Sequence, residues 1–492
     1  MTANPSAVWV GPARVRPSRL AAEFYRQEYT DLEDQLDRSG HRLVVLGKLG
    51  RLFTGPFGSK LPASLYDTPD GVPLLRVQNI GNIFLNETDI ARIPLEVHED
   101  IHRSKLEPGD LALAKAGRLG ALSKIPAHIR ECNITQHIVG VKVRADKVRG
   151  SYLAAFFLSR FGSFQLKRQG IGTLIKYLGI EETRAAKVAV PDRRIQGYIG
   201  AKVELAERCQ SHSAKLRSRA MELLVQSWAW GNQGPAELQD KAASQTAHTV
   251  QPRIFEDRLD PEFYRPSFLA VDRWLDGQLC WRLSELVEAP VKGVQPSYDP
   301  DGSVPALTVT HVDPFVLDRN GASGLVTDAW LSRNARARIE AGELLYTVTG
   351  PPLGETVVVE KFHLPAAVNS HVSRVALRPH FKFPHLVAGM LNSPLGQLQT
   401  TRYSKGIRQK ELYSVDFVRF RFPKLSSQTC TRLERDLAAS CRLVEKARVL
   451  MEQAKADVET LIEGTLDVEA ILAGTLKAPT ADEIPELAED DV

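Results

Sequence analysis

The feature that most constrains the fold of this chain is an internal duplication. Arg258–Arg265 reads Arg-Leu-Asp-Pro-Glu-Phe-Tyr-Arg, and Arg19–Arg26 reads Arg-Leu-Ala-Ala-Glu-Phe-Tyr-Arg. The two segments are 258 − 19 = 239 residues apart in a chain of 492 residues. A spacing close to half the chain predicts that one large unit occurs twice.

Further matches continue the duplication downstream. His137 corresponds to His371 at an offset of 371 − 137 = 234. The same offset relates Val141 to Val375, Arg144 to Arg378, Gly162 to Gly396, Gln165 to Gln399, Gly172 to Gly406, Lys176 to Lys410 and Leu178 to Leu412. Repeats of solenoid proteins are only about 20–50 residues long. We therefore predict two homologous halves of domain size.

Composition is that of an ordinary globular protein. Apolar residues make up 43% of the chain and charged residues 25%, and the net charge of +4 permits nucleic acid as a partner without requiring it. The five cysteines form no CxxC pair, which is typical of a reducing compartment. The sequence has no signal peptide and no apolar run of membrane-spanning length. We expect a cytoplasmic protein with no membrane association.

Two long helices are predicted from heptad spacing. In each, nine positions alternate by four and three residues, which is the pattern of a helical seam. The first seam is Ile195, Ile199, Lys202, Ala206, Cys209, Ser213, Leu216, Ala220 and Leu223. The second is Leu433, Leu437, Ser440, Val444, Ala447, Met451, Ala454, Val458 and Leu461.

One edge of each seam consists mostly of small residues, such as Ser213 and Ser440. Small residues let two helix backbones approach closely, so we expect the helices to pair with each other. The alternative is that each helix packs only on its own domain. In a chain ordered domain–helix–domain–helix, a pseudo-twofold relation between the halves makes the helices antiparallel.

The predicted fold class is α+β, with two homologous mixed α/β domains related by a pseudo-twofold and an antiparallel coiled coil. Short apolar runs cut by Gly and Pro predict strands in each domain, and the first also has predicted helices at Ser151–Arg168 and Leu95–Lys105. The predicted segments are a flexible N-terminal extension (1–18), a first domain (19–191) opening with a helix at Arg19–Asp37, a first long helix (192–228), a linker (229–250), a second domain (251–424), a second long helix (425–475) and an acidic tail (476–492).

Several motifs resemble one known family. The segments are Thr54–Lys60 (TGPFGSK), Gly71–Ile80 (GVPLLRVQNI), Leu106–Leu111 (LEPGDL) and Ala116–Gly120 (AGRLG). They are similar to target-recognition domains of the DNA-specificity (S) subunits of Type I restriction–modification enzymes. The resemblance covers nearly the whole chain. The second copy departs from it, because Ala341-Gly-Glu replaces Pro-Gly-Asp and Thr349–Gly354 replaces the first Gly-containing loop.

The resemblance implies a non-catalytic subunit with no cofactor of its own. Each domain would read one half of a bipartite DNA target, and the helices would set the spacing and dock two methylation subunits. S-adenosylmethionine would be bound by those subunits, and ATP with Mg²⁺ by motor–nuclease subunits. An alternative is the recognition subunit of another phage-defence complex with a different effector.

Candidate DNA-binding residues are the polar side chains near the matched loops, since bases are read by Arg, Lys, Asn, Gln, Ser and Thr and phosphates by cations. In the first copy they are Lys60, Arg76, Gln78, Asn79, Lys115, Arg118, Asn133, Gln136, His137, Lys176 and Tyr177. In the second they are Thr308, Thr310, His311, Thr349, Asn369, His371, Arg408, Gln409 and Lys410. The matched pair His137 and His371 also fits a structural role.

A second motif points to a different class of protein. His98–His102 (HEDIH) fits HExxH, in which two His one helical turn apart bind zinc and Glu activates water. It lies in a short polar stretch without a clear third ligand, and its counterparts in the second copy are Leu331 and Ala335. A zinc hydrolase is therefore the outside alternative. No P-loop, dinucleotide-binding or adenine-methyltransferase motif occurs in the sequence.

Overall fold

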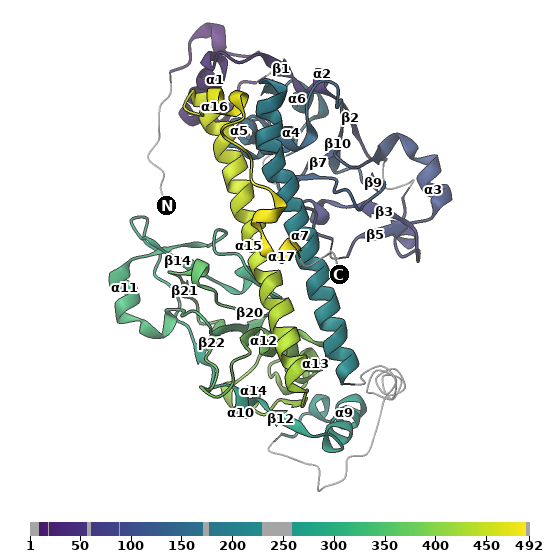
Figure 1. Cartoon of the computed structure of the whole chain (residues 1–492), viewed down its shortest axis with the longest axis vertical. Coiled ribbons are helices and arrows are strands. Elements are labelled where there is room, and N and C mark those ends of the chain that lie inside the picture. Colours follow the sequence, from purple (N-terminus) through teal and green to yellow (C-terminus); the bar gives the residue numbers. More distant parts are fainter. Residues whose placement is uncertain are drawn as a thin grey trace. The chain divides into compact units, whose positions relative to one another are not determined.

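The computed structural model describes residues 9–17, 19–56, 61–87, 89–170, 177–228 and 258–488 (Figure 1). The chain divides into two compact units. Unit 1 is Met1–Ser211 with Glu445–Val492, and unit 2 is His212–Val444. Each unit therefore contains one copy of the repeated domain together with a part of both long helices.

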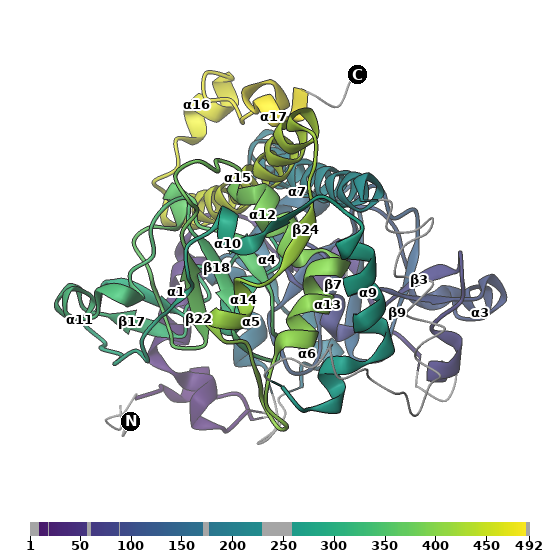
Figure 2. The same cartoon turned by 90° about the horizontal axis from the view of Figure 1, so that it is seen from below.

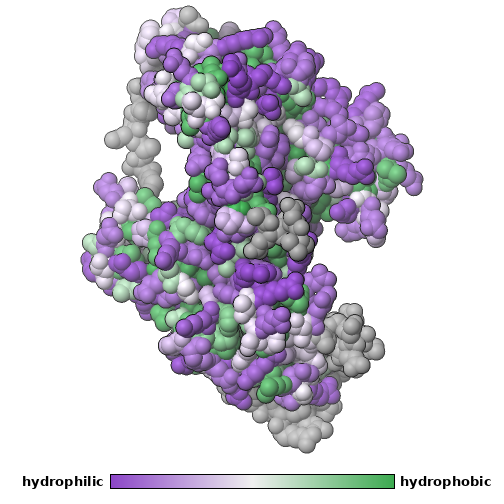
Figure 3. Space-filling model, viewed as in Figure 1, coloured by the Kyte–Doolittle hydropathy of each residue, from purple (hydrophilic) through white to green (hydrophobic). Residues whose placement is uncertain are grey.

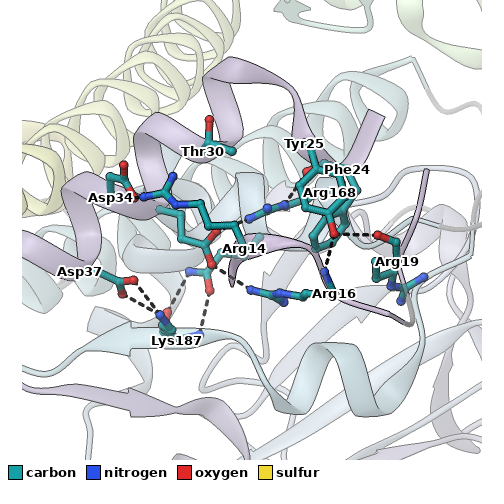
Figure 4. Close-up of polar contacts among 12 residues, drawn as sticks. Arg14, Arg16, Arg19, Phe24, Tyr25, Thr30, Asp34, Asp37, Arg168 and Lys187 are labelled. Atoms are coloured by element: carbon teal, nitrogen blue, oxygen red, sulfur yellow. Dashed lines mark hydrogen bonds and ion pairs between the residues drawn. The ribbon is translucent and has the colours of Figure 1, made fainter. Parts of the chain in front are cut away.

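The N-terminal segment of unit 1 is held in place over the residues described. The flexibility predicted for the N-terminal extension stays a prediction; among residues 9–17, Pro12–Arg14 forms a 3₁₀ turn (η1). Arg14 pairs with Asp34 at 2.5 Å and Arg16 with Glu33 at 2.9 Å, as Figure 4 shows in part. Both acids lie on α1 (Gln27–Arg38), so the segment is paired with that helix.

The first helix begins later than predicted. A 3₁₀ turn (η2, Ala22–Tyr25) precedes α1, and Arg26 between them is extended with φ −52° and ψ 141°. The Tyr25 hydroxyl donates to the carbonyl of Arg19 at 2.7 Å and accepts from the amide of Arg16 at 2.8 Å (Figure 4). These bonds close the turn, so the predicted continuous helix from Arg19 is wrong.

The domain of unit 1 contains a five-stranded sheet in the order β2-β10-β7-β8-β4 and a four-stranded sheet in the order β5-β3-β9-β6; β1 pairs with β11. The strands are β1 (Leu43–Val45), β2 (Gly50–Thr54), β3 (Val72–Leu75), β4 (Asn82–Ile83), β5 (Ala91–Ile93), β6 (Lys105–Leu106), β7 (Leu111–Ala114), β8 (Leu122–Lys124), β9 (Cys132–Ile134), β10 (Ile138–Val143) and β11 (Lys187–Ala189).

Short helices connect these strands and cover the sheets. They are α2 (Leu46–Leu49), η4 (Ala63–Leu65), η5 (Val77–Asn79), α3 (Leu95–Asp100), η6 (His102–Ser104), α4 (Gly150–Leu158), α5 (Arg160–Arg168) and α6 (Ile180–Arg184). Leu153 to Phe157 on α4 are fully buried, as expected for a helix that is apolar on all sides. The predicted helix 151–168 is interrupted at Ser159, whose backbone is extended.

Unit 2 repeats this arrangement. A four-stranded sheet has the order β13-β22-β18-β20, a three-stranded sheet has the order β17-β14-β21, and β12 pairs with β24, β15 with β16 and β19 with β23. The strands are β12 (Cys280–Arg282), β13 (Val291–Lys292), β14 (Val304–Leu307), β15 (Val312–Asp313), β16 (Val316–Leu317), β17 (Gly324–Val326), β18 (Leu344–Thr347), β19 (Thr349–Gly350), β20 (Thr356–Val358), β21 (Ala367–Val368), β22 (Val372–Val375), β23 (Lys410–Glu411) and β24 (Arg421–Pro423).

The helices of unit 2 also follow the order of unit 1. They are η8 (Pro261–Tyr264), α9 (Pro266–Asp276), α10 (Leu283–Leu286), η9 (Val309–His311), α11 (Asp328–Arg333), η10 (Ala335–Ala337), η11 (Lys361–His363), α12 (Pro384–Asn392), α13 (Pro394–Tyr403) and α14 (Ser414–Phe417). Ser393 accepts from the amide of Gly396 at 3.1 Å and starts α13, which packs alongside α9 (Figure 2).

The register of the paired strands repeats as well. In unit 1 Val141 of β10 lies opposite Leu111 of β7, and in unit 2 Val375 of β22 lies opposite Leu344 of β18. β3 pairs with β9 in parallel, as β14 does with β21. The prediction of two homologous mixed α/β domains is therefore confirmed.

The two long helices are α7 (Arg193–Ser227) and α15 (Ser427–Glu463) (Figure 1). Of the predicted seam positions, all are buried except Leu216, Leu223 and Val444, which are half-buried. In unit 1 Lys202 of α7 is bonded to Asp457 of α15. In unit 2 Ser213 donates to the carbonyl of Ser440 at 2.8 Å. As residue numbers increase along α7, the numbers of the α15 residues that it contacts decrease. The predicted antiparallel pairing is therefore confirmed.

Two boundaries differ from the prediction. The second long helix ends at Glu463 rather than at 475, because Gly464 takes a left-handed conformation with φ 75°. The segment that follows forms α16 (Val468–Ala473), a 3₁₀ turn (η12, Ala481–Glu483) and α17 (Pro485–Ala488). The compact units also divide within the helices rather than at their ends. The pseudo-twofold stays a prediction, and the predicted linker at 229–250 lies outside the described residues.

None of the helices described is both long and apolar enough to cross a bilayer. The face seen in Figure 3 is largely hydrophilic, with apolar residues scattered over it. Apolar residues gather instead in the cores of the units, such as the cluster around Leu224, Phe263, Phe420 and Leu437 in unit 2.

Candidate nucleic-acid interface

In unit 1, backbone hydrogen bonds bring several loops together at one edge of the sheets. The amide of Lys115 donates to the carbonyl of His137 at 2.8 Å, and the carbonyl of Lys115 accepts from the amide of Leu178 at 2.8 Å. The amide of Thr135 donates to the carbonyl of Leu75 at 3.1 Å. Segments 76–79, 115–118, 135–137 and residue 177 therefore meet, and we call them the first loop cluster.

Unit 2 has the same edge with the same bonds. The amide of Val348 donates to the carbonyl of His371 at 3.0 Å, and the carbonyl of Val348 accepts from the amide of Leu412 at 2.9 Å. The amide of Asn369 donates to the carbonyl of Leu307 at 3.0 Å. Segments 308–311, 348–350, 369–371 and 405–410 form the second loop cluster. The histidines of the matched pair thus serve the fold through their backbone in both units.

Two of the predicted contact residues are buried and cap equivalent turns. The Asn79 side chain accepts from the amide of Arg76 at 2.9 Å and donates to the carbonyl of Asn86 at 3.0 Å. In unit 2, His311 accepts from the amide of Thr308 at 2.9 Å through Nδ1. Its Nε2 lies 2.7 Å from the carbonyl of Gly321. In this structure both side chains hold the turns η5 and η9.

Three more predicted residues are also buried. Asn133 lies 2.6 Å from Nδ1 of His98 and accepts from the Ser104 hydroxyl at 2.9 Å. Asn369 accepts from the amide of His371 at 3.1 Å. Thr349 lies in β19 with 7% of its surface exposed. Their side chains are directed into the protein.

The remaining predicted residues of the first loop cluster reach the surface to different degrees. Arg118, His137 and Gln78 are exposed, and Tyr177 is 43% exposed. Lys115, Gln136 and Arg76 are half-buried.

Some of these side chains already have partners within unit 1. Arg76 and Gln78 both bind the Asp89 carboxylate, at 2.9 and 3.0 Å. Arg118 donates weakly to the carbonyl of Ile80 at 3.4 Å, and the Gln136 amide lies 3.2 Å from Nε2 of His137. Binding of an anion by Arg118 or Lys115 therefore costs less free energy in broken internal hydrogen bonds than binding by Arg76.

In the second loop cluster the surface lies mainly on the loop before β23. Arg408 and Gln409 are exposed, while Lys410 and His371 are half-buried. Lys410 pairs with Glu262 at 2.8 Å. Thr308 and Thr310 share a hydrogen bond of 3.0 Å between their hydroxyls.

Sequence reasoning missed two residues of this loop. Ile407 is fully exposed between Gly406 and Arg408, and Lys405 pairs with Asp416 at 2.8 Å. Gly406 has φ 110°, which a side chain would disfavour. The sequence did contain a signal for this loop: a glycine followed by a single apolar residue between positively charged residues. Lys60 and Lys176, two further predicted residues, lie outside the described part of the chain.

One acidic group in unit 2 has an unusual titration. Burial, and then the nearby Asp313 carboxylate, raise the pKa of Glu355 to about 7. Burial and the Asp318 carboxylate raise the pKa of Asp313 as well. Glu355 ends the loop that replaces the Gly-containing loop of the first copy, and its amide donates to the Thr347 hydroxyl at 2.9 Å.

The HExxH motif does not form the metal-binding helix that the zinc alternative requires. α3 ends at Asp100, and His102 begins the separate turn η6. His98 is buried against Asn133, whereas His102 is exposed and bonds through Nδ1 to the carbonyl of Glu99 at 2.9 Å. The two imidazoles are held in different surroundings and do not share one helix. The motif therefore no longer supports the zinc-hydrolase alternative.

Comparison with family models gives no match, and neither does comparison with curated protein sequences. Among solved structures, the chain is similar to the S subunit of a Type-I restriction-modification system from M. genitalium, with 11% identity, 87% of this chain and 96% of that chain covered, and a TM-score of 0.37. It is also similar to the HsdS subunit from Thermoanaerobacter tengcongensis, with 16% identity, 87% and 97% covered, and a TM-score of 0.30. At these identities and scores the likeness does not extend to function.

Proposed function

We propose that this protein is a non-catalytic DNA-specificity subunit of the Type I restriction–modification class. It reads a bipartite target in double-stranded DNA and docks methylation subunits, and motor–nuclease subunits where they are present. The observation that carries the proposal is the pair of loop clusters. The same backbone bonds build them in both units, while the side chains that reach the surface differ.

This combination suits a protein that reads two different half-sites. A repeated scaffold presents loops in the same way twice, and different side chains then select different bases. The first loop cluster offers Lys115, Arg118 and Gln136, and the second offers Arg408 and Gln409. Arg and Gln match the donor and acceptor patterns of guanine and adenine in the major groove.

The paired long helices support the second part of the proposal. A pair of stiff, antiparallel helices has a length that thermal motion changes little, which a bipartite target with a fixed gap requires. Their seam positions are largely buried and leave polar faces elsewhere on the helices. Methylation subunits, with S-adenosylmethionine as their cofactor, are the partners expected for such faces.

The test begins with co-purification of the full chain and the methylation subunit encoded near it. We expect a stable complex that binds one bipartite sequence tightly and methylates adenine within it. Sequencing that detects methylated adenine in the host genome, with and without this gene, would identify the target. A stable chain that binds no methyltransferase would contradict the proposal.

Matched variants then test the loop clusters. Arg118→Ala and Arg408→Ala should each weaken binding by about 5- to 100-fold if the side chain reads a base, with relaxed preference at one half-site only. If it contacts phosphate, the log–log salt slope should fall by about 0.9. Arg38→Ala on α1 and Arg273→Ala on α9 remove exposed cations outside both clusters and should change neither. Equal losses of DNA affinity in all four variants would mean that binding depends only on the net charge of the protein.

A second candidate keeps the DNA-recognition module and changes the effector to another nuclease of a phage-defence complex. The same co-purification separates the two, because the partner recovered would be a nuclease in place of a methyltransferase.

A further inference from the structure

Three side chains that favour metal ions converge in unit 2. Glu360 precedes η11, His385 lies in the first turn of α12, and Cys441 lies on α15. One nitrogen, oxygen or sulfur atom from each lies within 4.8 Å of the other two. His385 and Cys441 are buried and Glu360 is half-buried. Among the described residues this is the group whose donor atoms are close enough to share one ion.

The ring of His385 is held by a fourth residue behind it. Nδ1 of His385 lies 2.9 Å from one oxygen of Glu434, whose other oxygen accepts from the amide of Leu386 at 2.9 Å. A carboxylate that bonds Nδ1 of a histidine fixes its orientation and makes Nε2 the ligating nitrogen, as in many zinc sites.

Nε2 of His385 faces the other candidate ligands without a hydrogen bond. It lies 3.1 Å from Oε1 of Glu360, but the two atoms are not aligned for a hydrogen bond, and Nε2 is fully buried. Burial has removed water from this nitrogen, and the Glu360 carboxylate is the charged group that it faces. Two ligands of a tetrahedral ion with bonds of about 2.0–2.2 Å lie about 3.3–3.6 Å apart, so a small outward shift of these two atoms would admit the ion.

The duplication supplies an internal comparison. At the offset of 234, Ser151 replaces His385 and Glu207 replaces Cys441. In unit 1 Glu207 pairs with Lys124 of β8 at 2.6 Å, so an ion pair fastens α7 to the sheet. In unit 2 the position equivalent to Lys124 is Val358. At the same place the second copy has an imidazole and a thiol and does not have that ion pair.

We propose that Glu360, His385 and Cys441 bind one zinc ion. Thiolate, imidazole and carboxylate together suit this borderline-soft cation, and three protein ligands leave a coordination position for water. Glu434 is a positioning residue that holds the imidazole. The ion fastens α12 and the loop before η11 to α15 and does in unit 2 what the Lys124–Glu207 pair does in unit 1. The site is independent of DNA binding.

Cobalt substitution of the purified full chain tests the site. After removal of bound metal with a chelator, Co²⁺ should bind at one equivalent per chain and produce the near-ultraviolet band of thiolate-to-cobalt charge transfer. Cys441→Ser should abolish that band. Cys209→Ser and Cys430→Ser, which remove buried thiols from α7 and α15, should leave it unchanged.

Measurements of zinc affinity and of melting temperature test the site further. They use other variants, so the test does not depend on the folding of a single variant. Glu434→Gln should weaken Zn²⁺ binding by about 10- to 100-fold with the band retained. Zinc should raise the melting temperature of the wild-type chain and have little effect on Glu360→Gln. Absence of the cobalt band in the wild-type chain would overturn the proposal. The proposal would also be overturned if His98→Ala lost zinc while Cys441→Ser kept it. It would equally be overturned if Cys209→Ser removed the cobalt band as Cys441→Ser does.

Discussion

Arg168 and Arg402 occupy the same position in the two halves of the chain and make the same contacts. Nε of Arg168 donates to the carbonyl of Phe24 at 2.6 Å, and its guanidinium lies 3.9 Å from the centre of that ring. Nε of Arg402 donates to the carbonyl of Phe263 at 3.2 Å, with its guanidinium 4.5 Å from the ring. The repeated segment that opens each half is thus fastened to the domain by one buried arginine.

Removing either arginine should destabilise its own unit. The side chains are 5% and 4% exposed and pair with Glu33 at 2.7 Å and Asp272 at 2.5 Å. Arg168→Met leaves the half-buried Glu33 carboxylate with only the more exposed Arg16 as a cation and should cost about 3 kcal/mol. In a unit of this size the melting temperature should fall by about 6–12 °C. Arg402→Met should do the same in unit 2, and Arg38→Met, at an exposed site of α1, should change the melting temperature by little.

The small residues between the long helices should tolerate no enlargement. Ser213 and Ser440 are fully buried, and their hydroxyls lie 2.8 Å apart. Ser440→Leu should overpack the contact and cost about 1–3 kcal/mol, whereas Ser213→Ala should cost about 1 kcal/mol for the lost hydrogen bond. Ser218→Leu, at an exposed position of α7, is the control. Chemical denaturation followed by circular dichroism measures all three, and a harmless Ser440→Leu would refute close pairing at this point.

Asn133 should matter for stability rather than for DNA recognition. Its amide joins His98 to Ser104 inside unit 1. Asn133→Ala leaves buried polar atoms without this partner and should cost about 1–3 kcal/mol. Gln136→Ala, three residues further on and half-buried, should change stability by less than about 0.5 kcal/mol. Unchanged stability of Asn133→Ala together with altered target preference would show that the residue reads DNA after all.

Glu355 should make unit 2 less stable as pH rises. Burial and Asp313 raise its pKa to about 7, above its ordinary value of 4.5, so the folded state holds a proton that the unfolded state has released. This contribution is fully present below pH 4.5 and is lost as pH rises through about 7. After allowance for solvent screening, the loss should be about 1–2 kcal/mol. Melting temperatures between pH 5 and 8 should show it in the wild-type chain and not in Glu355→Gln, and parallel curves would contradict the assignment.

Much of the architecture was predictable because its signals are local or periodic. The match of Arg19–Arg26 with Arg258–Arg265 reports duplication directly, and burial at nearly every seam position follows from helical period alone. The helix end at Glu463 was missed, although the predicted seam ends at Leu461 and the glycine that stops the helix, Gly464, follows it.

The candidate interface was only partly predictable. Arg118 and Arg408 lie on exposed loops as expected, whereas Asn79, Asn133 and His311 cap turns or bridge buried groups. An asparagine that reads a base and one that holds a turn have the same sequence signature. Which of the two it is depends on the partners that distant segments bring to it.

By itself, the amino-acid sequence determined that the chain is one domain made twice with two paired helices, because duplication and periodicity are properties of the order of residues. Only the tertiary structure decided which polar side chains reach solvent and that Glu360, His385 and Cys441 meet. These three are separated by up to 441 − 360 = 81 residues. Their meeting depends on how helices α12 and α15 pack, and packing is set by contacts across the whole core, which no local pattern encodes.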